Sequence, residues 1–272
     1  MIQGYQTAIV TGASRGVGVY IAKALAKEGM NLVLAARNAD GLDNVAKDIE
    51  AFGGRVVVVP TDLTDRNAIE TLASTAEAEF GEIDVLVNNS ALDSTTFFHN
   101  ESLDGIDQLL YVNLTAPIIL TRLLLPGMLE RRRGHIVNIV SLAAKIPFPN
   151  DVMYATSKAG LGHFTSSLRA ECRGTGVSAS AILPGMFTDT GLSAQALKDV
   201  GMTKPKSVPT SPPETAGQAV IDAIRKDLAE VAIPAPAIMF TRIPSLGTLF
   251  LKGTGVMAML KEVATIRGRA KD

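Results

Sequence analysis

Short, continuous apolar runs alternate along the chain with longer segments whose apolar positions recur at helical spacing. The runs are rich in Val, Ile, Leu and Ala, and segments such as 19–30 and 41–53 separate the first of them. Runs of about four to eight apolar residues are typical of strands that helices cover on both faces. The pattern predicts an α/β fold with a doubly wound, mostly parallel sheet of seven strands. We expect strands at residues 7–12, 31–37, 55–63, 83–90, 135–141, 177–185 and 229–234.

The alternation continues without a segment of linker composition until about Gly185, so we expect a single domain over residues 1–272. Residues 186–213 are instead rich in Thr, Ser, Gly, Lys and Pro, which is typical of a mobile flap beside a ligand. Residues 235–272 form a tail that is more apolar than the fold needs to complete its sheet. We expect this tail to be a lid over the site, a subunit contact or a membrane-surface contact.

Composition and charge exclude several classes of function. Lys and Arg number 26 against 27 Asp and Glu, so the chain has no overall positive field that would attract nucleic acid. The single cysteine cannot form an internal disulfide and no signal peptide precedes the first strand, so we expect a cytoplasmic protein. No uninterrupted apolar stretch reaches the ~18 residues typical of a transmembrane helix. The three histidines lie in different neighbourhoods, and we predict no metal site.

A glycine-rich turn separates the first expected strand from the first expected helix. Gly12, Gly16 and Gly18 follow a G-x-x-x-G-x-G spacing. Glycine lets the backbone approach a pyrophosphate closely, and a helix N-terminus offers free N–H groups and partial positive charge. The turn therefore predicts a dinucleotide cradle, although an ordinary strand-turn-helix junction is the alternative.

Cofactor selectivity depends on the end of the second expected strand. A site that selects NAD(H) usually places Asp or Glu there, where the carboxylate binds the ribose 2′-hydroxyl. This chain has no acid at that position; Arg37 follows the strand, and Arg15 lies in the glycine turn. Two guanidinium groups suit a 2′-phosphate, so we expect NADP(H) in preference to NAD(H). The alternative is that both arginines are ordinary surface charges.

Tyr154 and Lys158 lie four residues apart, a spacing that makes them neighbours on a helix surface. A free phenol has a pKa of about 10, so it transfers protons poorly near neutral pH unless its phenolate is stabilised. A nearby ammonium group stabilises the phenolate and lowers that pKa. We interpret the pair as a proton-transfer group and the lysine that tunes it, with an ordinary surface pair as the alternative.

Taken in order, the glycine turn, NNSA at residues 88–91, Ser141 and YATSK at residues 154–158 resemble the motifs of the short-chain dehydrogenase/reductase superfamily. The resemblance extends from about residue 7 to residue 189 and implies a Rossmann-like fold. It also implies a catalytic tetrad of Asn113, Ser141, Tyr154 and Lys158. In that family the tyrosine transfers the proton and the serine holds the carbonyl oxygen. The lysine also binds the nicotinamide ribose, and the asparagine anchors a water by interrupting its helix.

The resemblance assigns further contacts at the adenosine end of the cofactor. Asp62 would contact adenine, although an acid after a strand is also a common helix cap. Asn88 begins the segment near the adenosine ribose, in which Ala91 replaces the family's usual glycine. This replacement limits the freedom of the local backbone.

The resemblance also assigns contacts at the nicotinamide end. Pro184 and Gly185 match the segment that lies against the nicotinamide, and we choose Thr188 over Asp189 and Thr190 as the carboxamide contact. The full set of expected cofactor-binding residues is Gly12, Ser14, Arg15, Gly16, Val17, Gly18, Arg37, Asp62, Leu63, Asn88, Tyr154, Lys158, Pro184, Gly185 and Thr188.

These features predict an NADP(H)-dependent carbonyl reductase or alcohol dehydrogenase that acts on a small, hydrophobic substrate. A reductase of 3-oxoacyl thioesters is the alternative enzyme, and it should show a basic docking surface near the site. A sensor that binds NADP(H) without turnover is the alternative outside catalysis. The resemblance further implies a homodimer or homotetramer. The residues expected to shape an apolar pocket, or else to belong to the core, are Phe97, Phe98, Phe148, Pro149 and Met153.

Overall fold

The computed structural model describes residues 2, 4–204, 206–243, 245, 248–249, 252–253 and 255–269. Within this part of the chain, seven parallel strands form one sheet in the order β3-β2-β1-β4-β5-β6-β7. The doubly wound fold expected from the hydrophobic pattern is confirmed, and each expected strand is present. The strand bounds are β1 (Thr7–Thr11), β2 (Asn31–Ala36), β3 (Val56–Pro60), β4 (Val85–Asn88), β5 (Gly134–Ile139), β6 (Val177–Pro184) and β7 (Glu230–Ile233).

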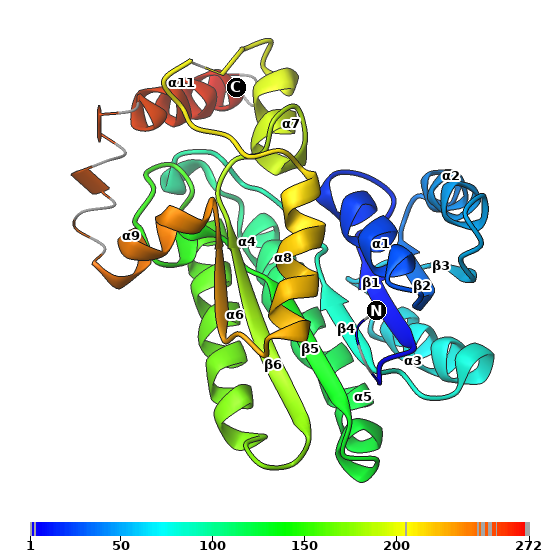
Figure 1. Cartoon of the computed structure of the whole chain (residues 1–272). Helices are drawn as coiled ribbons and strands as arrows, with labels where there is room; N and C mark the ends of the chain where they lie inside the picture. Colours follow the sequence, from blue (N-terminus) through cyan, green and yellow to red (C-terminus); the bar gives the residue numbers. More distant parts are fainter. Residues whose placement is uncertain are drawn as a thin grey trace.

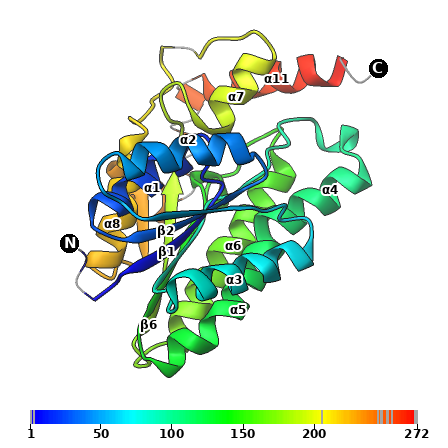
Figure 2. The same cartoon turned by 90° about the vertical axis from the view of Figure 1, so that its right-hand side faces the viewer.

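Two layers of helices cover the sheet (Figures 1 and 2). One face is covered by α1 (Val17–Lys27), α2 (Ala39–Glu50) and α8 (Glu214–Arg225). The other face is covered by α3 (Arg66–Phe80), α5 (Ala116–Glu130) and α6 (Val152–Glu171). The shorter elements are η1 (Phe98–Asn100), α4 (Leu103–Leu110), η2 (Tyr111–Thr115), η3 (Leu142–Ala144), α7 (Gly191–Asp199), η4 (Ala235–Ala237), α9 (Ile238–Arg242) and α11 (Val256–Arg269).

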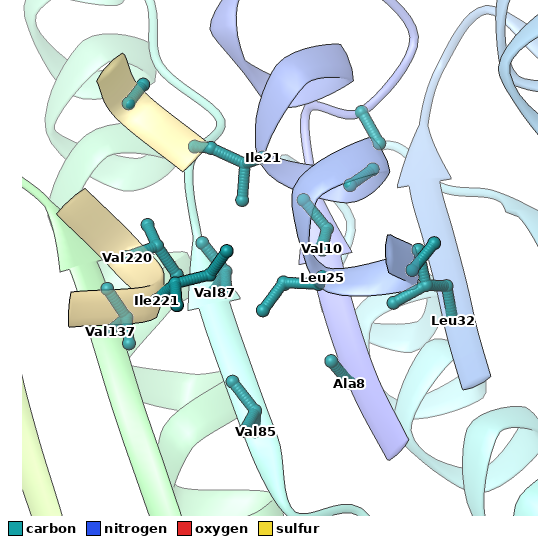
Figure 3. Packing of buried hydrophobic residues seen from close by; sticks show 14 of the residues in the cluster. Ala8, Val10, Ile21, Leu25, Leu32, Val85, Val87, Val137, Val220 and Ile221 are labelled. Carbon is teal, nitrogen blue, oxygen red and sulfur yellow. The ribbon is translucent and has the colours of Figure 1, made fainter. Parts of the chain in front are cut away.

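The strands send alternate residues into the two helix layers. Ala8 and Val10 of β1 pack with Ile21 and Leu25 of α1 in one cluster (Figure 3), whereas Ile9 belongs to the cluster on the opposite face. None of these side chains is exposed to solvent. Because both faces of the sheet are buried, each strand needs a nearly continuous apolar run, which explains the pattern that predicted the fold.

One helical stretch in the described part of the chain, Leu103–Glu130, has the length and hydropathy to cross a membrane. Its most apolar window is 44% buried inside the protein. Leu120, Leu124 and Met128 of this stretch belong to the core cluster against the sheet. Packing against the sheet therefore explains why the buried side chains of this stretch are apolar.

At the carboxyl ends of the strands, α7 and α11 lie side by side (Figures 1 and 2). Ala196 and Leu197 of α7 pack with Val256, Met259 and Val263 of α11 in a hydrophobic cluster of their own. The structure thus brings described parts of the flap and of the tail together. Residues 205, 244, 246–247, 250–251, 254 and 270–272 of these two segments lie outside the described residues.

Candidate active site

A cavity of about 1090 Å³ lies at the carboxyl ends of the strands, where the turns after β1 and β4 both line its wall. The strand order reverses between β1 and β4, and ligands of open α/β sheets bind at such a reversal. The expected site residues that line the cavity are Gly12, Ser14, Arg15, Gly16, Val17, Arg37, Asp62, Leu63, Ser141, Tyr154, Lys158, Pro184 and Gly185. The remaining expected residues, Gly18, Asn88, Asn113 and Thr188, do not line it.

The glycine turn brings the N-terminus of α1 to the cavity. Gly12 and Gly16 have φ angles of 66° and 64°, in the left-handed region that favours glycine. A Cβ atom on Gly18, in the first turn of α1, would lie 2.2 Å from the carbonyl oxygen of Gly12. Gly18 therefore permits the close packing of the helix beneath the turn, and only the other two glycines face the cavity.

We call the part of the cavity that is lined by the glycine turn and by the ends of β2 and β3 its nucleotide half. Two arginines and one carboxylate lie there. The side chains of Arg15 and Arg37 are exposed there, and Ala36 ends β2 without an acid. Oδ1 of Asp62 accepts hydrogen bonds from the backbone N–H and the hydroxyl of Thr64, at 2.9 and 2.8 Å. The backbone hydrogen bond from Thr64 and the charge of Arg37 hold the pKa of Asp62 below its usual value.

Asp62 is not the cap of the helix that follows it. The side chain of Asp65 accepts the capping hydrogen bond of α3 from the Asn67 N–H, at 2.9 Å. The carboxylate of Asp62 instead orders the turn at Thr64, and it stays on the wall of the cavity.

Asn89, and not Asn88, reaches the cavity at the end of β4. Nδ2 of Asn88 donates to Oδ1 of Asn138 at 2.8 Å, inside the core. Nδ2 of Asn89 donates to the carbonyl oxygens of Thr11 and Gly12, at 2.9 and 3.1 Å, and so ties the end of β4 to the glycine turn. Successive residues of a strand point to opposite faces, so the expectation for Asn88 is corrected by one position.

Ser141, Tyr154 and Lys158 line the same cavity as the glycine turn and as the apolar side chains of η3, α7 and α11, which we call its apolar half. Ser141 follows β5, and its Oγ accepts a hydrogen bond from the Ala143 N–H at 3.1 Å. Lys158 is 2% exposed, and its Nζ donates to the carbonyl oxygen of Ile139 at 2.8 Å and lies 5.8 Å from the centre of the Tyr154 ring. The three functional groups are therefore held by β5 and α6, the rigid parts of the fold.

The expectation that Lys158 lowers the pKa of Tyr154 needs a correction. Burial raises the pKa of Tyr154 above its usual value, the charge of Asp151 raises it further, and a hydrogen bond with Ser141 only partly opposes this. Burial also lowers the pKa of Lys158 to about 7. Lys158 is buried and Tyr154 is half-buried on the cavity wall, so the cost of removing charge from water outweighs the attraction between an ammonium group and a phenolate.

Asn113 lies in the π-helical turn η2 between α4 and α5, so the expected interruption of its helix is present. Its Oδ1 accepts from the Leu92 N–H at 2.8 Å, and its Nδ2 donates to the Leu92 carbonyl oxygen at 3.0 Å and to the Ser157 Oγ at 3.1 Å. The Ser157 hydroxyl in turn donates to the carbonyl oxygen of Tyr154, at 2.7 Å. Asn113 therefore joins the loop after β4 to the turn of α6 that holds Tyr154.

The threonine chosen for the nicotinamide contact lies outside the cavity wall. The Thr188 hydroxyl donates to Thr210 Oγ1 at 3.0 Å, and its backbone N–H donates to the Ser211 carbonyl oxygen at 2.9 Å. The two alternatives, Asp189 and Thr190, both line the cavity. The bonds between the two sides of the flap therefore turn Thr188 away from the cofactor end of the site.

Sequence reasoning missed several polar residues of the cavity wall, among them Asn89 and Asp151. The sequence motifs could have indicated both residues. Asn89 is the second residue of NNSA, and Asp151 lies three residues before Tyr154. Among the residues that the structure describes, no group of three or more His, Cys, Asp and Glu side chains could hold a metal ion.

A parallel sheet with a phosphate-binding turn after its first strand, together with a Ser, Tyr and Lys set beside that turn, defines a class of nicotinamide-dependent oxidoreductases. Residues 6–201 match the family model described as short chain dehydrogenase. The chain is 40% identical over 228 residues to the ketoacyl reductase HetN of Nostoc sp. (strain PCC 7120 / SAG 25.82 / UTEX 2576), covering 84% of this chain and 78% of HetN. The chain belongs to the short-chain dehydrogenase/reductase family.

Two solved structures show the same fold with a cofactor. A metagenomic short-chain oxidoreductase in complex with NADP is 33% identical, with a TM-score of 0.72 and coverage of 84% of this chain and 96% of that one. A variant of the actinorhodin polyketide ketoreductase with NADPH is 27% identical, with a TM-score of 0.74 and coverage of 85% of this chain and 95% of that one. The protein is therefore an NAD(P)-dependent oxidoreductase of this family.

The residues present fit such a dinucleotide. The positive φ angles of Gly12 and Gly16 leave the turn free of side chains where a pyrophosphate would bind, and Asn89 fixes that turn through two hydrogen bonds. This turn, Arg37 and Lys158 all line one cavity of about 1090 Å³, a volume large enough for a dinucleotide. Arg15, Arg37 and Asp62 would hold the adenosine half, and Tyr154 and Lys158 the nicotinamide half.

Proposed function

We propose that the protein is an NADP(H)-preferring carbonyl reductase, or alcohol dehydrogenase in the reverse direction, whose substrate is a small hydrophobic molecule. The observation on which this proposal depends is that Tyr154 and Ser141 line one cavity together with the glycine turn and a set of apolar side chains. A carbonyl group bound in the apolar half would meet both hydroxyl groups.

The dinucleotide, when bound, supplies or accepts the hydride. In reduction, Tyr154 donates its phenolic proton to the carbonyl oxygen, and Ser141 holds that oxygen with its hydroxyl. The raised pKa of Tyr154 keeps its phenol protonated, as a proton donor requires. An alkoxide that develops on the substrate is a stronger base than a phenolate, so the transfer is favourable. Lys158, with a pKa lowered to about 7, can return the proton to Tyr154.

The preference for NADP(H) is supported by the charges at the end of β2. Arg15 and Arg37 both face the cavity there, and the end of β2 has no carboxylate that would repel a 2′-phosphate. The two solved relatives described above are complexes with NADP and NADPH, respectively.

The preference for an apolar substrate is supported by the lining of the second half of the cavity. Phe148, the only expected pocket aromatic on the described wall, lines this half, while Phe97, Phe98, Pro149 and Met153 do not. Further apolar side chains of the wall come from η3, the segment after it, α7 and α11; they include Leu142, Ile146, Leu197, Val256, Met259, Leu260 and Val263.

A 3-oxoacyl thioester reductase is the second candidate, and the similarity to the ketoacyl reductase HetN favours it. The basic run before β5 does not provide its docking surface. Arg133 is paired with Asp84 at 2.8 Å and with Glu82 at 2.6 Å, and all three lie at the amino end of the sheet, opposite the cavity. The cytoplasmic location and the homodimer or homotetramer stay predictions. The contact of the tail with a membrane surface stays one of its three expected roles.

The test is the loss of NADPH absorbance when the purified protein meets matched sets of hydrophobic ketones, aldehydes and 3-oxoacyl thioesters. We expect turnover with NADPH on free, apolar carbonyl compounds, and slower turnover with NADH. Turnover confined to the thioesters would select the second candidate. Tight NADPH binding with no turnover on any of the three sets would contradict a reductase and favour a sensor.

A further inference from the structure

Asp151 is a buried acid on the substrate side of the cavity. It lies one residue before α6, lines the cavity and is 9% exposed. It precedes Tyr154 by three residues at the start of the helix, a spacing that places two side chains on the same helix face. The effect of the Asp151 charge on the pKa of Tyr154 shows the same proximity. The carboxyl group therefore lies close to the proposed proton donor.

The usual structural role of an acid at this position is absent. An Asp before a helix normally caps it by accepting a hydrogen bond from a backbone N–H of the first turn. The side chain of Asp151 makes no such bond to α6. Its buried Oδ1 has no hydrogen-bond partner among the residues that the structure describes. A buried carboxyl oxygen without a partner has a cost in free energy, so stability of the fold does not explain this residue.

The charged groups around Asp151 do not supply the missing partner. Asp93, on the loop after β4, and Glu101, before α4, are further acids whose charge acts on Asp151, and Arg267 of α11 is the cation that opposes them. Arg267 is engaged with other carboxylates, at 3.0 Å from Asp93 and 3.6 Å from Asp199. These charged groups therefore add acceptors around Asp151 and give its Oδ1 no donor.

Two hydroxyl groups of the loop after β4 do not donate to Asp151 either. Ser94 Oγ and Thr96 Oγ1 are buried without a hydrogen-bond partner in the described part of the chain. Their loop is joined to the segment before α6, because the Thr96 N–H donates to the carbonyl oxygen of Asn150 at 2.9 Å. Neither of these two residues lines the cavity, so Asp151 is the buried, unpaired polar side chain of the cavity wall in the described part of the chain.

We propose that Asp151 determines substrate specificity by binding a hydrogen-bond donor, a hydroxyl or an ammonium group, that an otherwise apolar carbonyl substrate has next to its carbonyl. This inference rests on the proposed function, since it names the substrate class of the same site. A substrate with such a group supplies the donor that the protein lacks. An isosteric substrate with a methyl group there leaves the buried carboxyl group unpaired and is rejected.

The test uses three phenyl ketones that differ in one group on the carbon next to the carbonyl: propiophenone with methyl, 2-hydroxyacetophenone with hydroxyl and 2-aminoacetophenone with ammonium. The affinity of each ketone is measured by titration into the enzyme saturated with NADP⁺, a complex that cannot reduce it. Turnover with NADPH is measured separately. We expect the hydroxyl or the ammonium ketone to bind roughly ten- to a hundredfold more tightly than the methyl ketone.

Substitutions assign this preference to the side chain. Asp151→Asn keeps the shape and one acceptor oxygen, so it should remove most of a preference for ammonium and less of a preference for hydroxyl. Asp151→Leu should reverse both preferences in favour of the methyl ketone. Glu101→Gln removes a neighbouring acid that does not line the cavity, and it should leave the order of affinities unchanged. Unchanged NADPH affinity in each variant shows that the fold is intact.

The outcomes separate this inference from the proposed function. Equal affinities for the three ketones in the wild-type protein, or an order that Asp151→Asn does not change, overturn the role of Asp151 even if turnover is normal. An order of affinities that depends on Asp151, found without any turnover, supports the substrate class and contradicts the reductase.

Discussion

At the scale of single residues, Arg37 is the side chain from which cofactor preference follows most directly. It is exposed on the cavity wall directly after β2. Arg37→Asp should weaken NADPH binding by roughly ten- to a hundredfold, because a charge-assisted contact with the 2′-phosphate is replaced by repulsion. NADH, which lacks this phosphate, should lose less than about threefold. Titration of both cofactors measures the two dissociation constants.

Arg55→Asp is the matched control for this prediction. Arg55 lies 5.3 Å over the Phe80 ring, next to the amino end of β3, and does not line the cavity. Its replacement should change neither cofactor's affinity. An equal loss of NADPH and NADH affinity in Arg37→Asp would show that Arg37 does not select between them.

Residues in fixed motifs could be predicted from the sequence, and residues in irregular loops could not. Gly12 and Gly16 were predictable because a close turn demands glycine at set positions. Thr188 was not, because its orientation depends on hydrogen bonds to Thr210 and Ser211, more than twenty residues away along the chain. The direction of the pKa shift of Tyr154 could not be predicted from the neighbouring residues either. Burial, which depends on the whole fold, raises this pKa more than the charge of a lysine one turn away can lower it.

At the scale of elements, β5 contains a buried histidine that should make stability depend on pH. Nε2 of His135 lies 2.8 Å from Ser180 Oγ, whose hydroxyl donates to the Leu228 carbonyl oxygen, so the neutral ring donates to Ser180. Burial lowers the pKa of His135 from 6.5 to about 4. The folded state therefore binds fewer protons than the unfolded state between these values, and the free energy of unfolding falls as the pH falls through that window.

The loss expected from His135 is roughly 3 kcal/mol across the window, and urea unfolding at several pH values measures it. His135→Gln should show a smaller fall in the free energy of unfolding over the same window. Asp151, whose raised pKa acts in the opposite direction, is present in both proteins and cancels in the comparison. Parallel curves for the two proteins would contradict this assignment.

The strands and long helices were predictable, while the interruption and placement of other helices were less so. Strands such as β1 and β4 are buried on both faces, so their sequences alone mark them as nearly continuous apolar runs. The π-helical turn at Asn113 was expected only through the family resemblance, and the hydrogen bonds of the Asn113 side chain reach Leu92, twenty-one residues away along the chain. The contact between α7 and α11 depends on packing between distant segments.

At the scale of the whole molecule, sequence motifs define the nucleotide half of the site and do not define the substrate half. The nucleotide half consists of turns whose residue types are dictated by phosphate chemistry. The substrate half is closed by α7 and α11, and Arg267 ties α11 to Asp93 and Asp199. This half combines apolar side chains with the unpaired Asp151, a combination that appears only when the middle of the chain is brought together with its C-terminal part.

The measurement that tests the account most directly compares Tyr154→Phe with the wild-type protein in turnover and in NADPH binding. Because the phenol is the proposed proton donor, turnover should fall by roughly a hundred- to ten-thousandfold while NADPH affinity stays within about twofold. Tyr20→Phe, on α1 and away from the cavity wall, should behave as the wild type does. Turnover of Tyr154→Phe within about tenfold of the wild type would contradict the proposed role of this tyrosine.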